Sequence, residues 1–472
     1  MTKKAFKYDM QRGLGSCVLA LKNMEDAQKE AYRSIVLWGC SRELAFDAQC
    51  EGCRSIYLYD LITEFSDVTP FIDMIERRLF HSMHSSGWEF HQDCEILAYF
   101  VSDRVRRAWK VLMACYHALF QSLLETCEPD QHGRFAERDN FQSLCLTLVN
   151  LCFADQKQRV AFFQKIVKDL CVLSEENPLF SVGYFDWFQC VSEDSLGKKT
   201  MYKLLYRADA EEYIKKYVRL MEEYQREREA AREKRRRAEP KTAEELYKLI
   251  QNGEKIDKMW TLFLMRRWLK ENKEQEIWRL AAYYREEKDL EIRFQLLRLL
   301  AKEECAHILD LDCLFQDSES AYTKLSECAF QALAQRKDTS VREYALKLLH
   351  QEIHIDYAVS MLAKNYDACD RNIFVKAARQ IPITYRKREW HGAFLAIIRL
   401  LEAPGRGKPS ELLLYMYRNM LCSFCREYVV REMGRRRMLT RALLEEMQYD
   451  CNDDIRSYAE RKLFRMMGIE VH

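Results

Sequence analysis

Apolar residues recur at helical spacing between Asp338 and Leu349. They stand at relative positions i, i+4, i+7 and i+8, which form one stripe along a helix. These positions hold Val341, Ala345, Leu348 and Leu349. Asp338 stands just before the stripe, where a carboxylate can accept a hydrogen bond from the first turn. The segment therefore predicts a capped helix that buries one face.

The same order of cap, apolar–arginine pair and stripe recurs along the chain. Other copies read Asp289, Ile292, Arg293, Leu296 and Leu300; then Asn452, Ile455, Arg456, Ala459 and Leu463; and, in the N-terminal half, Ser102, Val105, Arg106, Trp109 and Met113. In a further copy, Asp370, Ile373, Ala377 and Ile381 keep the frame while Phe374 replaces the arginine. A single helix pair cannot bury its own apolar face, so the recurrence predicts stacked pairs.

The helical period predicts most of the elements. In the first half, helices are expected at about 7–21, 28–46, 50–66, 68–82, 88–101, 103–125, 138–153 and 156–173. In the second half, antiparallel pairs are expected at about 242–252 with 256–271, 273–285 with 289–303, 321–335 with 338–353, 355–365 with 370–381, and 437–449 with 452–467. Residues 198–238, between the two halves, are strongly charged. They predict a long solvated helix that ends before Pro240. We therefore divide the chain into residues 1–197, 198–240 and 241–472.

Proline and glycine are scarce, which indicates that the whole chain is helical and not only the segments with a helical period. The chain has 7 Pro and 14 Gly in 472 residues, against typical usage of about 5% and 7%. An all-β chain needs more turn residues than this. We expect an all-α fold, an α-solenoid of antiparallel helix pairs that winds as a right-handed superhelix.

The Asp–Val–Arg start of the second helix resembles that of the HEAT-repeat (armadillo-like) α-solenoid family, most clearly over residues 242–472 and more weakly over 1–200. The resemblance implies a ladder of polar contacts between neighbouring repeats. Its expected members are Asp289, Arg293, Asp338, Arg342 and Arg456, the last with Asp453 or Asp454. HEAT proteins are mostly scaffolds and adaptors. A smaller group resembles alkylpurine DNA glycosylases, which cradle DNA on a basic concave face.

Charge and cysteine usage bound the partners and the compartment. The 75 Lys and Arg residues balance 73 Asp and Glu residues, so no overall field draws the chain to nucleic acid or to an anionic membrane. No apolar run approaches the roughly 18–20 residues of a membrane span, and the N-terminus lacks an apolar signal-peptide core. Eighteen Cys without a secretion signal predict reduced thiols in the cytoplasm.

Basic clusters in the C-terminal half offer a local exception to the balanced charge. The candidate contacts for nucleic acid or an acidic partner are Arg386, Lys387, Arg388, Arg435, Arg436 and Arg437. Tyr385 and Trp390 stand beside the first cluster, and basic residues with interleaved aromatics can grip a phosphate backbone. An ordinary solvated face is the other interpretation of these residues, because acidic residues are equally numerous.

Histidines and cysteines supply the candidate metal ligands. His81, His84, His91 and Cys94 form two i, i+3 pairs that could converge on zinc from two antiparallel helices. Their spacing is not that of a standard zinc finger, and we expect no metal and no cofactor. Two CxxC units, at Cys50–Cys53 and Cys422–Cys425, lie in opposite halves, and we expect packed thiols there.

Function is the least constrained conclusion from the sequence. The chain contains no HExxH, GxSxG or Walker A motif, and we expect no catalysis. The leading hypothesis is a non-enzymatic scaffold that holds a protein partner on the concave surface of the solenoid. The alternative is a nucleic-acid-binding or HEAT-like DNA glycosylase-type protein that uses a basic face of the C-terminal half.

Overall fold

The protein is helical throughout the part of the chain that can be described. The computed structural model describes residues 1–85, 87–125, 135–177, 179–207, 209–253, 258–271, 273–302, 304–384, 389–405 and 407–467. Within these ranges every regular element is a helix and there is no strand. Most helices pack against their neighbours in sequence order. The all-α solenoid class is therefore confirmed, while the right-handed sense of the superhelix stays a prediction. None of the helices described is both long and apolar enough to cross a membrane.

The chain folds into two compact units. Unit 1 comprises Met1–Lys234, Met420–Glu427 and Met438–His472, and unit 2 comprises Arg235–Asn419 and Tyr428–Arg437. The chain leaves unit 1 within one long helix and returns to it near the C-terminus. The predicted division into 1–197, 198–240 and 241–472 follows chain order, whereas the units join the last helices of the chain to the first ones.

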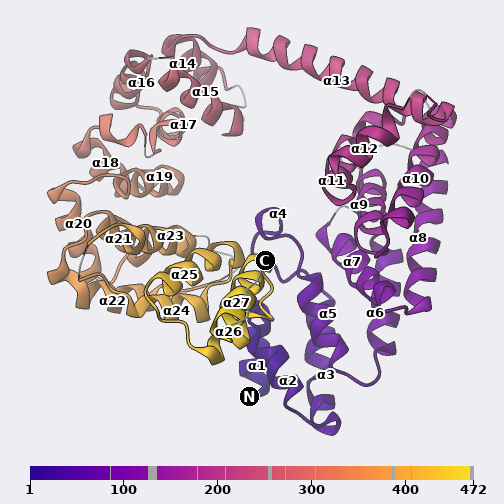
Figure 1. Ribbon diagram of the computed structural model, residues 1–472. Helices are drawn as coiled ribbons and strands as arrows, with labels where there is room; N and C mark the ends of the chain where they lie inside the picture. The colour runs from indigo at the N-terminus through magenta and orange to yellow at the C-terminus, as the bar shows by residue number, and fades with distance from the viewer. Residues whose placement is uncertain are drawn as a thin grey trace. The chain divides into compact units, whose positions relative to one another are not determined.

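Unit 1 holds the N-terminal helices and the two last ones (Figure 1). Its helices are α1 Lys3–Arg12, α2 Ser16–Lys22, α3 Asp26–Cys40, α4 Ala48–Glu51, α5 Ser55–Thr63, α6 Thr69–Ser82, α7 Trp88–Ser102, α8 Arg106–Glu125, α9 Ala136–Asn150, α10 Gln156–Glu176, α11 Asp186–Leu196, α12 Lys198–Leu205, most of α13 Glu212–Ala238, α26 Arg441–Met447 and α27 Asp453–Met466.

Unit 2 holds the helices that follow α13. They are α14 Ala243–Gln251, α15 Lys258–Lys270, α16 Glu274–Glu286, α17 Leu290–Leu300, α18 Leu311–Ser318, α19 Thr323–Leu333, α20 Thr339–His350, α21 Ile355–Lys364, α22 Arg371–Gln380, α23 Glu389–Glu402 and α24 Glu411–Asn419. Helix α25, Ser423–Arg435, begins among residues of unit 1 and ends among those of unit 2. Short 3₁₀ turns lie at Val182–Phe185, Ala306–Ile308 and Ala368–Asp370.

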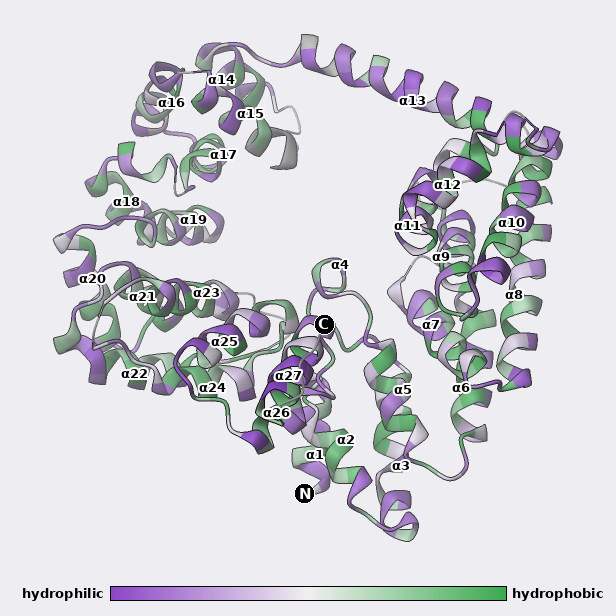
Figure 2. Ribbon diagram, in the orientation of Figure 1, coloured by the Kyte–Doolittle hydropathy of each residue, from purple (hydrophilic) through white to green (hydrophobic). Residues whose placement is uncertain are grey.

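The charged helix predicted before Pro240 is α13, which ends at Ala238. Its first turns bury Ile214, Tyr217 and Met221 in the core of unit 1. Most of its remaining length is hydrophilic in Figure 2. The first turns are therefore anchored by packing, and charged residues keep the following turns in solvent.

Three of the predicted caps are present. The side chain of Asp289 accepts hydrogen bonds from two amides of α17, Asp338 accepts one from α20, and Asn452 accepts one from α27. Ser102 differs from the prediction, because it is the last residue of α7 and its hydroxyl donates to the Tyr99 carbonyl. A serine can bond to its own preceding turn as readily as it caps the next helix.

The predicted helix at 7–21 is broken in two. Gly13 adopts φ 68° and caps the end of α1, a left-handed conformation that glycine tolerates best. A Cβ at this position would lie 2.2 Å from the sulfur of Cys451. The break is therefore imposed by close packing of a distant part of unit 1 as well as by the turn.

The C-terminal segments of unit 1 bond to its first helices. The Cys451 amide donates to the Gly13 carbonyl over 2.9 Å. Arg54 donates to the Leu421 carbonyl over 3.1 Å and to the Gln11 carbonyl over 2.5 Å. A carboxylate oxygen of Glu51 accepts from both the amide and the hydroxyl of Ser423, at 2.9 and 2.7 Å. Contacts between the first helices and the C-terminal segments are therefore part of the structure of unit 1.

Helix pairing in unit 2 differs from the prediction by one helix. Helix α18 packs against α19, and α20 packs against α21. The predicted pair 321–335 with 338–353 corresponds to α19 with α20, which are consecutive helices but not the closely packed ones. The cause is α18, an 8-residue helix too short for its period to stand out in the sequence. The later predicted pair of 355–365 with 370–381, which is α21 with α22, does pack, while upstream of α18, among the described residues, helix α14 packs more closely against α16 than against α15.

The predicted apolar stripe of α20 is part of the core, because Val341, Ala345, Leu348 and Leu349 are all buried. The stripe predicted on α8 is wrong: Val105, Trp109 and Met113 are only half-buried, and α8 buries Ala108, Leu112 and Cys115 instead.

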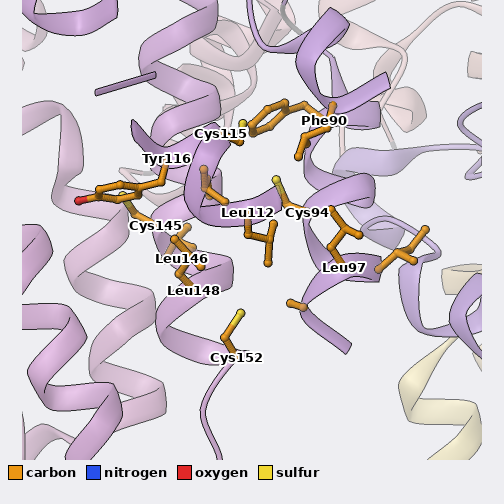
Figure 3. Close-up of a cluster of buried hydrophobic side chains, with 14 of the residues drawn as sticks. Phe90, Cys94, Leu97, Leu112, Cys115, Tyr116, Cys145, Leu146, Leu148 and Cys152 are labelled. Carbon is orange, nitrogen blue, oxygen red and sulfur yellow. The ribbon is translucent and has the colours of Figure 1, made fainter. Parts of the chain in front are cut away.

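In unit 1, cysteines take part in the core as small hydrophobic residues: Figure 3 shows Cys94, Cys115, Cys145 and Cys152 among leucine and aromatic side chains. Burial raises the pKa of Cys115 and of Cys152 to about 12. These thiols are packed. Of the two CxxC units expected to be packed, Cys422 and Cys425 are buried, but Cys50 is exposed and Cys53 is half-buried.

Candidate functional site

A concave groove in unit 2 is the main candidate site. It has a volume of about 1540 Å³ and is lined by the end of α17, by α19, by the start of α20, and by α21 and α23. Helix α19 packs on α21, and α21 packs on α23, so these three form a row. We call this feature the inner groove. It follows from stacking, because a row of helices related by similar packing presents one continuous surface.

The inner groove carries charges of both signs. Its basic residues are Arg266, Lys302, Lys337, Arg342, Lys364 and Arg399. Its acidic residues are Glu304, Glu327, Asp338 and Glu389. Among the described residues, Arg266 and Lys337 form no ion pair, and both are exposed. The groove can therefore place hydrogen bonds and ion pairs along an extended ligand of mixed charge.

Tyr357 provides the main aromatic surface of the groove. Its ring stacks on Phe330, with ring centroids 4.9 Å apart and 13° between the planes. Burial raises the pKa of the Tyr357 phenol, and the nearby carboxylates, Glu327 foremost, raise it further. The phenol therefore keeps its proton and can donate a hydrogen bond to a ligand.

Asn365 lines the groove, but its side chain is hydrogen-bonded to the backbone of neighbouring segments. Its side-chain oxygen accepts from the Asp338 amide over 2.8 Å, and its amide group donates to the Arg336 carbonyl over 2.9 Å. These bonds tie the end of α21 to the start of α20. Asn365 therefore holds the shape of the inner groove and offers little hydrogen-bonding capacity to a ligand.

Gly392 leaves room in the inner groove. It lies on α23, it is exposed, and a Cβ added there would meet nothing within 4 Å. Bulk can therefore be introduced at this position without disturbing the helix. Glycine also lowers helix stability by about 1 kcal/mol relative to alanine.

Of the basic residues singled out from the sequence, Arg435, Arg436 and Arg437 do not line the inner groove. Arg386, Lys387 and Arg388 lie outside the described residues. Arg435 lies 2.8 Å from Glu432 and 3.2 Å from Glu402, and Arg436 lies 2.6 Å from Glu432. These contacts neutralise much of the charge that a phosphate backbone would need.

The predicted ladder arginines of unit 2 form ion pairs, but with aspartates other than the predicted Asp289 and Asp338. Arg293 pairs with Asp317, at 2.8 Å, and donates to the Tyr284 carbonyl over 2.8 Å, rather than pairing with Asp289. Arg342 binds Asp370 through two nitrogens, at 2.9 and 2.7 Å. The acidic residues at 289 and 338 are occupied in capping, as described above.

Unit 1 contains the same type of contact in a deeper position. Arg426 binds both oxygens of Asp450, at 3.1 and 2.7 Å, and neither side chain is exposed. It also donates to the Arg12 carbonyl over 2.7 Å. Arg456, a predicted ladder member, pairs with Asp60 at 2.7 Å and not with Asp453 or Asp454.

Sequence reasoning missed the partners Asp317, Arg426 and Asp450. A signal was present, since the aspartate follows its arginine by 24 residues in two pairs and by 28 in the third. That spacing matches the length of one helix pair with its turns. The spacing between arginine and aspartate can be recognised only after the short helices have been located.

The four candidate metal ligands from the sequence do not meet. His81 is exposed at the end of α6, and His84 contacts Glu137. Cys94 lies in the apolar core with Cys115 (Figure 3). Of the four, only His91 belongs to a group of three potential metal ligands among the described residues, together with Cys53 and Glu95.

Comparison with known proteins adds little to this geometry. No protein-family model matches the chain, and no curated protein matches it. One of the solved structures that match is the crystal structure of an engineered protein, with 11% sequence identity over 99% of each chain and a TM-score of 0.19. A TM-score this low carries no argument about fold or function.

Proposed function

We propose that this protein is a non-enzymatic, HEAT-like scaffold that holds an extended segment of a partner protein in the inner groove of unit 2. The observation that carries the proposal is the groove itself. Its volume of about 1540 Å³ exceeds the roughly 300–1,000 Å³ of small-molecule sites. A polypeptide segment fills such a space and satisfies polar groups along its whole length.

The charge pattern favours a protein over nucleic acid as the occupant. Acidic residues such as Glu327 and Glu389 line the groove beside the basic ones, and each would repel a phosphate. Arg435 and Arg436 are held by Glu432. A protein segment of mixed charge can pair with both signs, whereas a phosphate backbone can pair with only one.

The HEAT-like assignment rests on three features of unit 2. Helices such as α18 and α19, and α20 and α21, pack as consecutive pairs. Asp289 and Asp338 cap the helices predicted from the repeat. Arg342 reaches an aspartate beyond the next helix. A cytoplasmic location stays a prediction from cysteine usage.

The proposal is tested by filling the groove. Gly392→Trp places an indole in the open space on α23, and we expect it to abolish binding of the partner that wild-type protein captures from lysate of its native cells. Helicity and melting temperature should not fall, because no atom lies within 4 Å of the new Cβ. Capture is measured by quantitative mass spectrometry.

The matched control changes an exposed position of unit 2 outside the groove. Lys376→Glu alters α22, where Lys376 is 68% exposed and 3.7 Å from Glu352, and it should leave capture unchanged. A partner captured equally by wild type and Gly392→Trp contradicts the proposal. So does binding that is dominated by nucleic acid and falls steeply between low and high salt.

A further inference from the structure

Three potential metal ligands converge in unit 1, on the side of α7 that faces α5. Cys53 lies just before α5, and His91 and Glu95 lie one turn apart on α7. One ligand atom from each residue lies within 4.8 Å of the others. The Cys53 thiol donates to Oε2 of Glu95 over 2.7 Å, and Nε2 of His91 lies 3.2 Å from Oε1 of Glu95.

This spacing is close to that of a zinc site. Zinc takes sulfur at about 2.3 Å and nitrogen or oxygen at about 2.0–2.2 Å, in tetrahedral geometry. Tetrahedral ligand atoms at those distances are about 3.5 Å apart. Small rotations of the three side chains would bring them from their present positions onto one ion.

We propose that Cys53, His91 and Glu95 bind one zinc ion, with water completing the tetrahedron. On binding, the bond between sulfur and hydrogen breaks, the thiolate sulfur bonds to zinc and the proton passes to solvent, while His91 and Glu95 donate lone pairs. No oxidation occurs. The site is independent of the inner groove and does not rest on the proposed scaffold function.

An unsatisfied atom in the cluster supports this assignment. Nδ1 of His91 is buried and has no hydrogen-bond partner among the described residues. Leaving a buried polar atom unpaired costs about 1–3 kcal/mol, and a rotation of the ring toward an ion would relieve it. Cys53, His91 and Glu95 are all partly exposed, so an ion can reach them from solvent.

Charges of both signs surround the cluster. Burial raises the pKa of Asp453, Arg456 lowers it, and the Glu95 carboxylate raises it again. Arg456 is engaged by Asp60 at 2.7 Å. A divalent cation bound at Cys53, His91 and Glu95 would relieve the repulsion among these carboxylates.

The arrangement does not suit a cysteine nucleophile. In such a site the histidine stands between the thiol and the carboxylate and lowers the thiol pKa. Here Glu95 contacts both the thiol and the imidazole. Burial and the Glu95 carboxylate raise the pKa of Cys53, which keeps the sulfur protonated until a metal displaces the proton.

Ser55 positions the carboxylate. Its hydroxyl donates to the same Glu95 oxygen that accepts from Cys53. Outer hydrogen bonds of this kind hold metal-binding carboxylates in orientation. The segment that leads into α5, from Cys53 to its first residue Ser55, therefore supplies both a ligand and a support for another ligand.

The test is a metal titration of the full-length chain after its metals are stripped with a chelator. Cobalt(II) is the optical probe, because a bond from thiolate sulfur to cobalt gives an intense near-ultraviolet band, and zinc is then titrated against a chromophoric chelator. We expect one zinc per chain. Cys53→Ser should abolish the sulfur–cobalt band, and His91→Gln and Glu95→Gln should each weaken zinc binding at least about 10-fold.

Matched controls use neighbouring residues that stand outside the cluster. Cys50→Ser removes the other cysteine of the same CxxC unit, and His84→Gln removes a histidine that contacts Glu137 instead. Both should bind zinc like wild type, and circular dichroism should show all five variants folded. Absence of stoichiometric zinc in the wild type overturns the proposal. So does a sulfur–cobalt band that survives Cys53→Ser.

Discussion

Unit 1 and unit 2 use the same arginine–aspartate contact in different surroundings. In unit 2, Arg342 on α20 binds Asp370 just before α22, one helix further along the chain than its neighbour α21, and the Arg342 side chain is 28% exposed. In unit 1, Arg426 and Asp450 are fully buried, and Arg426 also bonds to the Arg12 carbonyl, 414 residues away. In unit 2 the contact holds together helices that lie close in sequence. In unit 1 it joins the C-terminal segments to the first helix of the chain.

The difference predicts two kinds of stability. Unit 2 is built from contacts between consecutive helices, so damage should spread only to adjacent pairs. Unit 1 depends on contacts of very high sequence separation, which carry a large cost in loop closure before they form. A substitution that breaks the contacts of Arg426 should therefore destabilise the N-terminal and the C-terminal helices of unit 1 together.

The largest effect is expected from a charge on the buried stripe of unit 2. Ala345→Asp and Leu300→Asp each place an unpaired carboxylate at a fully buried position, which should cost about 5 kcal/mol or more. Hydrogen exchange followed by mass spectrometry should show loss of protection in unit 2 and preserved protection in α7 and α8. Glu343→Ala, on the exposed face of the same helix, should match wild type. Equal protection in all three variants would show that the stripe is misassigned.

The next effect distinguishes the buried contact of Arg426 in unit 1 from the partly exposed contact of Arg342 in unit 2. Arg426→Ala leaves Asp450 buried without its partner and should cost about 3–5 kcal/mol, with exchange rising in α1 and α27 together. Arg342→Ala removes a partly exposed contact and should cost about 1 kcal/mol, with exchange rising only in α20 and α22. Similar losses from both substitutions would contradict the distinction between the units.

The smallest effect concerns pH. Burial raises the pKa of Asp93 to about 8, and Arg78, 3.3 Å away, offsets this only in part. The unfolded value is about 3.9, so between these values the folded state keeps a proton that the unfolded state loses. Stability of unit 1 should therefore fall as pH rises from about 4 to 8.

Asp93→Asn should flatten that decline and raise stability at pH 8 relative to wild type. Unfolding by urea at several pH values, followed by exchange in α7, measures it. Asp26→Asn, at a position 70% exposed, is the control and should leave the pH dependence unchanged. If Asp93→Asn destabilises unit 1 instead, Asp93 is ionised and acts mainly as the partner of Arg78.

Local pattern was enough for much of unit 2. The stripe of Val341, Ala345 and Leu348 and the caps at Asp289 and Asp338 could all be read directly, because a helix repeats every 3.6 residues and a cap acts within one turn. The short helix α18 could not be read, since two turns give too few positions to establish a period. Its omission displaced the predicted pairing of α19 and α20.

By itself, the sequence determined the all-α class, most helix bounds and the buried faces, because these depend on residues less than about ten positions apart. Only the tertiary structure decided which helices close unit 1, and which side chains from different helices meet. Cys53 meets His91 and Glu95, while Cys94 of the same helix enters the core. Arg426 reaches the first helix of the chain. Such meetings depend on packing between helices distant in sequence, and no local spacing encodes them.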